Sequence, residues 1–172
     1  MNTLNTEYDV IIAGGGIVGL TLANALKSSG LSIAIIEQHE APVLTDEIDL
    51  RVSAMNPASL AVFERGGVSI GSFARLCAFH EMQVWDSTGA GQIHFDAAES
   101  GLDSLGYIIE NSIIQHALQH SVQAAETISW LCPQRIESVV WGDEAHTVTL
   151  DSGEQLSCRL LVAADGANSR LR

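Results

Sequence analysis

The chain has 172 residues, 47% of them hydrophobic, which is enough to bury the core of one domain with a small extension. Its formal net charge of −13 repels nucleic-acid phosphates and anionic lipid, so we expect no nucleic-acid partner. No apolar run approaches the roughly 20 residues that span a bilayer, and the N-terminus lacks the features of a signal peptide, so we predict a cytoplasmic protein.

The first forty residues predict a strand, a helix and a second strand. Segment 8–13 is a short β-branched run, segment 17–30 has apolar residues at helical spacing, and segment 31–37 is β-branched again. The two strands are apolar on both faces, which is typical of parallel strands buried between layers. A parallel pair joined by a helix crosses over right-handed. This pattern predicts the start of an α/β domain of Rossmann type.

Three glycines stand between the first strand and the helix with the spacing GxGxxG. Gly14 allows a tight turn, Gly16 lets the main chain approach a pyrophosphate, and Gly19 permits close packing of helix on strand. Free N–H groups and the helix dipole attract the anion. A glycine turn that only packs is the alternative.

Glu37 ends the second strand, where its carboxylate can accept hydrogen bonds from the hydroxyls of an adenosine ribose. An acid at this place also disfavours a 2′-phosphate. Together with the glycine turn, it predicts an unphosphorylated adenine dinucleotide as the ligand. These residues leave NAD and FAD both open.

An irregular acidic connection is predicted after Glu37, over 38–51, followed by a helix over 56–67 that stops at a glycine pair. Apolar and polar residues then begin to alternate. Two short segments with this pattern flank a glycine-rich turn, which predicts a β hairpin within 79–108. We expect this hairpin to belong to a second, antiparallel sheet.

A helix over 111–125 comes next, and segment 134–164 predicts an antiparallel meander. The last strand of the meander becomes fully apolar toward its end, so we expect it to enter the parallel sheet. Trp85, Trp130 and Trp141 lie on predicted strands, and we expect them to pack in cores or on sheet faces.

No residue pattern predicts a metal site. His116 and His120 stand four residues apart on a predicted helix without a third ligand, so we expect both at solvent-facing positions. The cysteines are odd in number, widely spaced and free of a CxxC pair, which favours reduced, mostly buried thiols; they are Cys77, Cys132 and Cys158.

The far end of the chain carries a second fingerprint. In RLLVAADGANSRLR, residues 159–172, an apolar strand runs into Asp165 and Gly166, and Ser169 and Arg172 follow. This resembles the second fingerprint of the para-hydroxybenzoate hydroxylase class. With IIAGGGIVGLTLANAL, LRVSAMNPAS, MQVWD and GYIIENSIIQHAL, essentially the whole chain is similar to the ubiquinone-biosynthesis FAD-dependent hydroxylases, most of all to the 2-octaprenylphenol hydroxylase branch.

The resemblance implies FAD as cofactor, NAD(P)H as reductant, molecular oxygen, and hydroxylation of a polyprenylated phenol or quinol in ubiquinone biosynthesis. The strands around Met82 to Phe95 would face that substrate. The resemblance names no catalytic residue, since the hydroxylating chemistry belongs to the cofactor. The cofactor-binding residues that it implies are Gly14, Gly16, Gly19, Glu37, Arg51, Asn111, Asp165 and Gly166.

Within this set, the resemblance puts Arg51 near the pyrophosphate and the flavin, where a guanidinium suits an anion. Its alternative is a local ion pair with one of three nearby acids, Asp46, Glu47 or Asp49. Asp165 is implied to bind the ribityl chain, with Gly166 letting it approach; an Asp-Gly turn that only follows a strand is the alternative. Asn111 stands where many relatives carry an arginine that touches the cofactor.

The family normally continues past the point that Arg172 corresponds to, with a later Gly-Asp segment and much of the substrate-facing sheet. We therefore expect an N-terminal FAD-binding fragment that binds FAD weakly or not at all and is inactive alone, because an open site does not exclude water. A homodimer through exposed apolar surface, and peripheral association with a membrane or a biosynthetic complex, are left open. The rival functions are an NAD-dependent dehydrogenase and a non-catalytic FAD-binding module.

Overall fold

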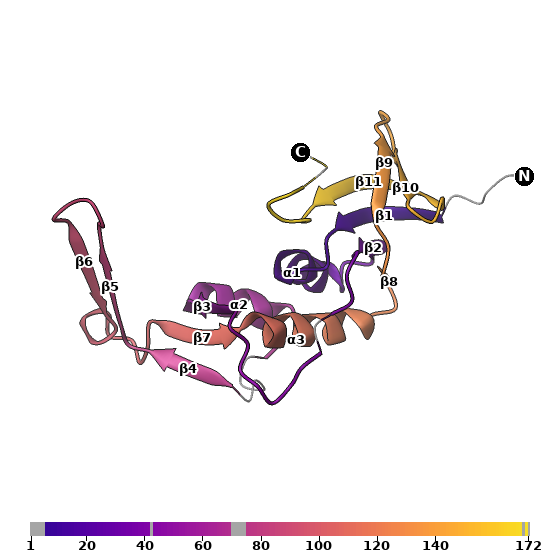
Figure 1. Cartoon of the computed structure of the whole chain (residues 1–172). Helices are drawn as coiled ribbons and strands as arrows, with labels where there is room; N and C mark the ends of the chain where they lie inside the picture. Colours follow the sequence, from indigo (N-terminus) through magenta and orange to yellow (C-terminus); the bar gives the residue numbers. More distant parts are fainter. Residues whose placement is uncertain (1–5, 42, 70–74, 170, 172) are drawn as a thin grey trace, which may run out of the picture.

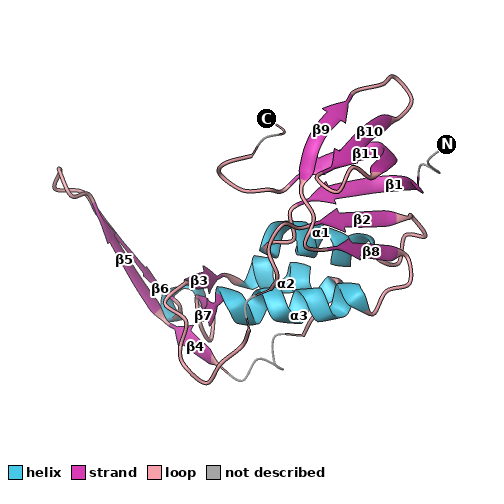
Figure 2. Ribbon diagram, turned by 45° about the vertical axis from the view of Figure 1, so that its right-hand side comes forward, coloured by secondary structure: helices cyan, strands magenta, loops and turns pink. Residues whose placement is uncertain are grey.

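The computed structural model describes residues 6–41, 43–69, 75–169 and 171, and Arg172 of the second fingerprint lies outside them. Its main sheet has the strand order β8-β2-β1-β11-β10-β9 (Figures 1 and 2). The strands are β1 (Thr6–Ala13), β2 (Ile33–Ile36), β8 (Ile128–Leu131), β9 (Ile136–Val140), β10 (His146–Leu150) and β11 (Gln155–Ala163).

Strands β8, β2, β1 and β11 are parallel to one another. Strands β10 and β9 continue the sheet beside β11 in antiparallel pairing. The meander predicted at 134–164 is therefore confirmed in β9, β10 and β11. Its last strand enters the parallel sheet beside β1, as the apolar run indicated. The predicted α/β fold class is confirmed by this arrangement.

Three helices lie on one side of the main sheet, where two of them contact its strands and the other packs on the first helix (Figure 2). They are α1 (Ile17–Leu26), α2 (Pro57–Arg65) and α3 (Asn111–Gln123). α2 begins where the Asn56 side chain caps the N–H of Ser59 and a proline occupies the first turn. α1 is shorter than the predicted 17–30, because the chain leaves the helix after Leu26 and turns at Gly30 with a φ of +79°. None of the helices in the described ranges is long and apolar enough to cross a bilayer.

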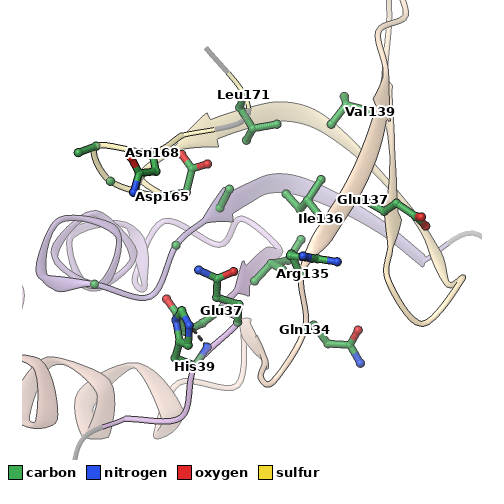
Figure 3. A pocket seen from close by; sticks show the side chains of 18 of the residues that line it. Glu37, His39, Gln134, Arg135, Ile136, Glu137, Val139, Asp165, Asn168 and Leu171 are labelled. Atoms are coloured by element: carbon green, nitrogen blue, oxygen red, sulfur yellow. Dashed lines mark hydrogen bonds and ion pairs between the residues drawn. The ribbon is translucent and has the colours of Figure 1, made fainter.

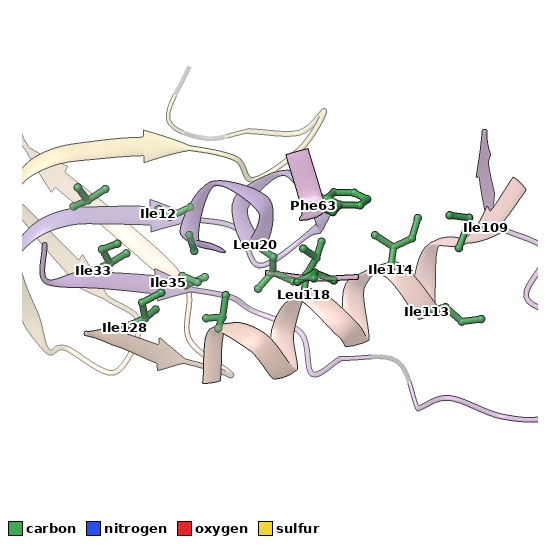
Figure 4. Close-up of a cluster of buried hydrophobic side chains, with 14 residues drawn as sticks. Ile12, Leu20, Ile33, Ile35, Phe63, Ile109, Ile113, Ile114, Leu118 and Ile128 are labelled. Atoms are coloured by element: carbon green, nitrogen blue, oxygen red, sulfur yellow. The ribbon is translucent and has the colours of Figure 1, made fainter. Parts of the chain in front are cut away.

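Alternation along β1 and β2 divides the buried side chains between two cores. Ile12 and Ile35 point to the helical face and pack with Leu20 and Leu118 in the larger core (Figure 4). The residues that alternate with them along the strands, Ile11 of β1 and Ala34 and Ile36 of β2, pack with β10 and β11 in the second core. Both faces of the parallel strands are thus buried, which fixes the carboxyl ends of these strands in a rigid layer.

A three-stranded antiparallel sheet that the sequence did not predict lies beyond the helices, with the order β3-β7-β4. Its strands are β3 (Val52–Met55), β4 (Leu76–Phe79) and β7 (Gly106–Glu110). The range predicted for the hairpin, 79–108, was too wide, because its first and last residues belong to β4 and β7. The hairpin itself is β5 (Glu81–Trp85) with β6 (Gln92–Asp96), followed by a short 3-10 helix, η2 (Ala98–Ser100).

The β5–β6 hairpin forms a separate two-stranded sheet that projects from the rest of the chain (Figure 1). The pairs Met82↔Phe95 and Val84↔Ile93 place four apolar side chains on one of its faces. All four are exposed, by 42 to 59%. The hairpin therefore presents an apolar surface to solvent.

The expectation that the tryptophans are packed is confirmed for one of them only. Trp130 is half-buried against the larger core, whereas Trp85 and Trp141 are exposed by 69% and 60%. Strand alternation alone does not tell whether a second layer covers a given face. The Trp141 ring meets the His146 ring edge-on, with ring centroids 4.9 Å apart, yet it stays largely exposed. His116 and His120 are both exposed, as predicted.

The cysteines differ in exposure, which predicts their order of reaction. Cys77 is exposed, so the expectation of mostly buried thiols is wrong for this residue, while Cys158 is fully buried. Burial raises the pKa of Cys132, with Glu37 and Glu40 adding to the effect, and burial also raises the pKa of Cys158. A raised pKa leaves less thiolate at a given pH and slows alkylation.

We expect iodoacetamide at pH 8 to modify Cys77 first and the other two thiols at least about tenfold more slowly. Peptide mapping by mass spectrometry over a time course measures the three rates separately. Modification of Cys132 or Cys158 as fast as Cys77 would contradict the described packing.

Candidate functional site

Three neighbouring parallel strands end in register at one edge of the main sheet. The register pairs Ala13, the last residue of β1, with Ile36 of β2 on one side and with Ala163 of β11 on the other. Three segments therefore leave the sheet side by side: the glycine turn, Glu37 and the Ala164–Asp165 segment. Hydrogen bonds of 2.8 Å, from the N–H of Gly14 to the Ile36 carbonyl and from the N–H of Ala164 to the Ala13 carbonyl, continue the ladder to this edge. Carboxyl ends of parallel strands are where open α/β sheets bind ligands.

Two of the glycines at this edge are required by close packing within the protein. Gly14 has a φ of +106°, and a Cβ there would overlap the carbonyl oxygen of Ala164. A Cβ on Gly19 would overlap the carbonyl oxygen of Gly14 and approach Ile12 Cγ2 to 3.2 Å. The roles predicted from the spacing, a tight turn and close helix packing, agree with this geometry.

Gly16 differs from the other glycines of the turn. A Cβ added there would meet no heavy atom within 4 Å, and the residue lines the cleft described below. Gly16 is also the N-cap of α1, where no side chain caps the helix and no acid stands in the first turn. The first N–H groups of α1 thus have no side-chain partner at the cap, which is the arrangement that binds the phosphates of a dinucleotide.

Glu37 closes the turn from the β2 side. Its Oε2 accepts the N–H of Gly15 at 2.6 Å, and its Oε1 accepts the N–H of His39 at 2.8 Å. The His39 ring nitrogen Nδ1 lies 3.5 Å from the same Oε1. Each carboxylate oxygen has a second lone pair, so the side chain keeps acceptor capacity for the hydroxyls of a ribose.

A cleft of about 1020 Å³ runs along this edge of the sheet (Figure 3). It is large among ligand pockets, which suits a dinucleotide. Six of the eight residues predicted to bind the cofactor line it: Gly14, Gly16, Glu37, Arg51, Asp165 and Gly166. Gly19 and Asn111 do not line it.

Asp165 lies on the opposite wall of the cleft from Glu37 (Figure 3). A Cβ on Gly14 would come within 2.9 Å of the Asp165 main-chain nitrogen, so the second fingerprint and the glycine turn are in direct contact. Gly166 follows with a φ of +84°, a left-handed turn that glycine adopts easily. This juxtaposition of two segments 150 residues apart is the geometry that a single extended cofactor needs.

Arg51 reaches the cleft from the connection between β2 and β3. Its side chain is exposed, and among the described residues it has no ion pair with Asp46, Glu47 or Asp49. Only its main chain is fixed by an acid, since the N–H of Arg51 donates to Asp49 Oδ1 at 2.9 Å. The guanidinium is therefore available to an anion in the cleft.

Asn111 is the first residue of α3 and contacts the main chain of Arg51 from outside the cleft. Its N–H donates to the Arg51 carbonyl at 2.9 Å, and its Oδ1 accepts the hydroxyl of Ser53 at 2.6 Å. The side chain is thus engaged with β3 and supports the segment that carries Arg51.

Several residues at the site were missed by reasoning from the sequence. Gln115 of α3 donates from Nε2 to the Gly15 carbonyl at 3.1 Å, and a Cβ on Gly15 would lie 2.5 Å from the Trp130 ring. Arg135 lines the cleft near Glu37 (Figure 3). No local pattern marks these residues, because each acts through contacts far along the chain. The helical spacing of 111–125 could have suggested only that Gln115 and Asn111 share a face.

Comparison with protein-family models matches residues 7–172 to the FAD binding domain family. The 3-demethoxyubiquinol 3-hydroxylase of Escherichia coli (strain K12) is 33% identical over 98% of this chain and 44% of the relative. The mitochondrial ubiquinone biosynthesis monooxygenase COQ6 of Homo sapiens is 33% identical over 98% of this chain and 39% of the relative. The chain thus spans less than half the length of these relatives, and the resemblance to ubiquinone-biosynthesis hydroxylases is confirmed.

Solved structures agree with the fold. That of pqsL, a probable FAD-dependent monooxygenase from Pseudomonas aeruginosa, has a TM-score of 0.73 and 27% identity, over 97% of this chain and 44% of the other. The p-nitrophenol 4-monooxygenase PnpA from Pseudomonas putida DLL-E4 has a TM-score of 0.78 over 98% of this chain and 43% of the other. At 19% identity the second match shows the fold alone.

Proposed function

Because this chain belongs to the FAD binding domain family, we propose that it forms the cofactor-binding part of a flavin-dependent aromatic-ring monooxygenase of ubiquinone biosynthesis. The substrate would be a polyprenylated phenol or quinol, hydroxylated with NAD(P)H and molecular oxygen. The observation that carries the proposal is the register of β2, β1 and β11, which brings both fingerprints to one cleft. The relatives' names supply the reaction class.

In this proposal each residue of the cleft binds a different part of the cofactor. Gly16 and the uncapped start of α1 hold the pyrophosphate, and Glu37 accepts hydrogen bonds from the adenosine ribose. Asp165, beside Gly166, accepts hydrogen bonds from the ribityl chain, and Arg51 places its positive charge near the pyrophosphate and flavin. Bound FAD supplies the redox chemistry, taking reducing equivalents from NAD(P)H and delivering them to oxygen.

The exposed apolar face of the β5–β6 hairpin supports the substrate class. Met82, Val84, Ile93 and Phe95 form this face, and apolar side chains stabilise an aromatic ring with an isoprenoid tail by removing both from water. We propose that this face belongs to the wall of the substrate site. A substrate of this kind also implies peripheral contact with a membrane or a biosynthetic complex around a cytoplasmic protein.

Glu37→Ala is expected to weaken FAD binding about tenfold, because it removes the ribose acceptor and leaves the N–H of Gly15 without its partner. Glu37→Gln keeps one acceptor oxygen and serves as the matched control, with an intermediate loss. Titration of FAD fluorescence measures both dissociation constants. Unchanged affinity in Glu37→Ala would refute the assignment of Glu37 to the ribose.

The rival function of a non-catalytic FAD-binding module is distinguished by turnover. A protein containing this chain and the remaining length of its relatives should oxidise NAD(P)H and hydroxylate a prenylated phenol, detected as a gain of one oxygen by mass spectrometry. Stoichiometric FAD without hydroxylated product would favour the binding module. Binding of NAD in the cleft in place of FAD would favour the other rival function, an NAD-dependent dehydrogenase.

A further inference from the structure

A buried ion pair lies outside the cleft, at the start of α3. The Nε of Arg75 is 3.0 Å from Oε1 of Glu110, and the Glu110 side chain is only 6% exposed. Neither residue lines the cleft. Burying a carboxylate is costly unless its charge is paired and its remaining lone pairs are used. The other hydrogen bonds of Arg75 and Glu110 therefore indicate the role of this ion pair.

Both partners bind the main chain of the same segment, 47–49. Glu110 Oε2 accepts the N–H of Asp49 at 2.8 Å, and Arg75 Nη1 donates to the Glu47 carbonyl at 3.2 Å. Apolar packing does not hold this segment, since Ile48 is 76% exposed. The ion pair and its two hydrogen bonds therefore fasten the segment to the body of the protein.

The fastened segment leads directly to Arg51. The side chain of Asp49 accepts the N–H of Arg51 at 2.9 Å, and the Arg51 carbonyl accepts the N–H of Asn111 at 2.9 Å. The same helix reaches the glycine turn through Gln115, which donates to the Gly15 carbonyl. The first turns of α3 therefore support both the segment that carries Arg51 and the glycine turn, and an anion in the cleft would lie between these two.

We propose that Glu110 and Arg75 are positioning residues, which hold the segment 47–51 against α3 so that the Arg51 guanidinium faces the cofactor in the cleft. The inference rests on the proposed function only in its last step, the use of Arg51 by the cofactor. The fastening itself is a property of this chain without ligand. A pair that merely stabilised the fold would not act on the ligand through Arg51.

The fastening is tested by amide hydrogen exchange of the chain without FAD. Glu110→Gln removes the charge but keeps the shape, and it should speed exchange of the Asp49 and Asn111 amides about tenfold. Amides of the main sheet, such as Ile35, should keep their rates. Glu126→Gln is the control with the same change in net charge, because Glu126 is exposed and forms no ion pair within the described part of the chain. Unchanged exchange at Asp49, or equal acceleration throughout the chain, would overturn the proposal.

The action through Arg51 is tested by a double-mutant cycle on FAD affinity. Glu110→Gln alone should raise the dissociation constant about fivefold, and it should have no further effect in the presence of Arg51→Ala. Equal weakening in both backgrounds would overturn the positioning role. The cycle is measured on a protein that contains this chain and the remaining length of its relatives. If that protein does not bind FAD, the proposed function fails, whereas the exchange experiment still decides the fastening.

A second variant covers the case in which Glu110→Gln does not fold. Arg75→Gln removes the other partner, whose side chain is 30% exposed, and it should give the same exchange pattern and the same dependence on Arg51. Loss of folding in both variants would show a pair needed for stability alone and would overturn the proposal.

Discussion

Gly16→Val is expected to abolish FAD binding, with a rise in dissociation constant of at least about 100-fold, while the chain stays folded. The backbone of Gly16 has φ −75° and ψ 179°, an extended conformation that a β-branched residue adopts readily. No protein atom lies within 4 Å of a Cβ at this position. The Cβ of the new side chain therefore has open space around it, and the two methyl groups beyond it would extend into the space assigned to the pyrophosphate.

FAD fluorescence titration together with thermal unfolding separates the two effects of Gly16→Val. The midpoint of unfolding should change by no more than a few degrees. Gly91→Val in the hairpin turn is the matched control, because a Cβ there also meets no atom within 4 Å but lies outside the cleft. Normal FAD affinity in Gly16→Val would mean that the turn cradles no cofactor.

Gly19→Ala is expected to have the opposite signature, a loss of stability. An alanine inside a helix normally stabilises it by up to about 1 kcal/mol relative to glycine. Here the added Cβ would overlap the Gly14 carbonyl oxygen, so α1 must move away from the turn. Overpacking of this kind costs about 3 kcal/mol, which lowers the unfolding midpoint by roughly 6 to 12 °C in a chain of this size.

Thermal unfolding of Gly19→Ala beside Gly16→Val tests whether the two glycines of one motif serve different purposes. The structure predicts that one variant keeps its stability and loses the ligand, while the other loses stability first. An unfolding midpoint of Gly19→Ala equal to that of the unmodified chain would contradict the close approach of α1 to the glycine turn.

The cleft was predictable because its residues follow strong local signals. Gly14, Gly16 and Glu37 stand at the ends of apolar β-branched runs, and the pairing of β1 with β2 brings strand ends of this kind together. Asp165 follows the apolar end of β11, residues 160–163, so the parallel pairing of β11 with β1 placed it at the same edge. Local pattern and sheet geometry together were sufficient here.

The second sheet and the supports of the cleft were not predictable for a physical reason. β3 and β4 have four residues each and pair with β7, whose residues lie far along the chain, as in Val52 with Glu110. The stability of such strands depends more on packing against their cross-strand neighbours than on the propensity of their own residues. The contact of Gln115 with Gly15 joins residues 100 positions apart, and no periodicity encodes it.

The buried pair of Arg75 and Glu110 illustrates the same limit. Its residues occur in the sequence as ordinary charged side chains, and Glu110 reads as an acid at the start of a helix. Its burial becomes visible only when β7, α3 and the 47–49 segment are assembled. Interactions of this kind are determined by tertiary packing.

The account depends most on one cofactor bridging the glycine turn and the Asp165 corner, and amide chemical shifts test this directly. Addition of FAD to a protein that contains this chain and the remaining length of its relatives should shift the amides of Gly14 and Gly16 and those of residues 165–168 together. ADP, which lacks the ribityl and flavin groups, should shift the glycine turn and Glu37 and should shift residues 165–168 much less than FAD does. Shifts confined to one side with FAD, or none at either, would contradict the account.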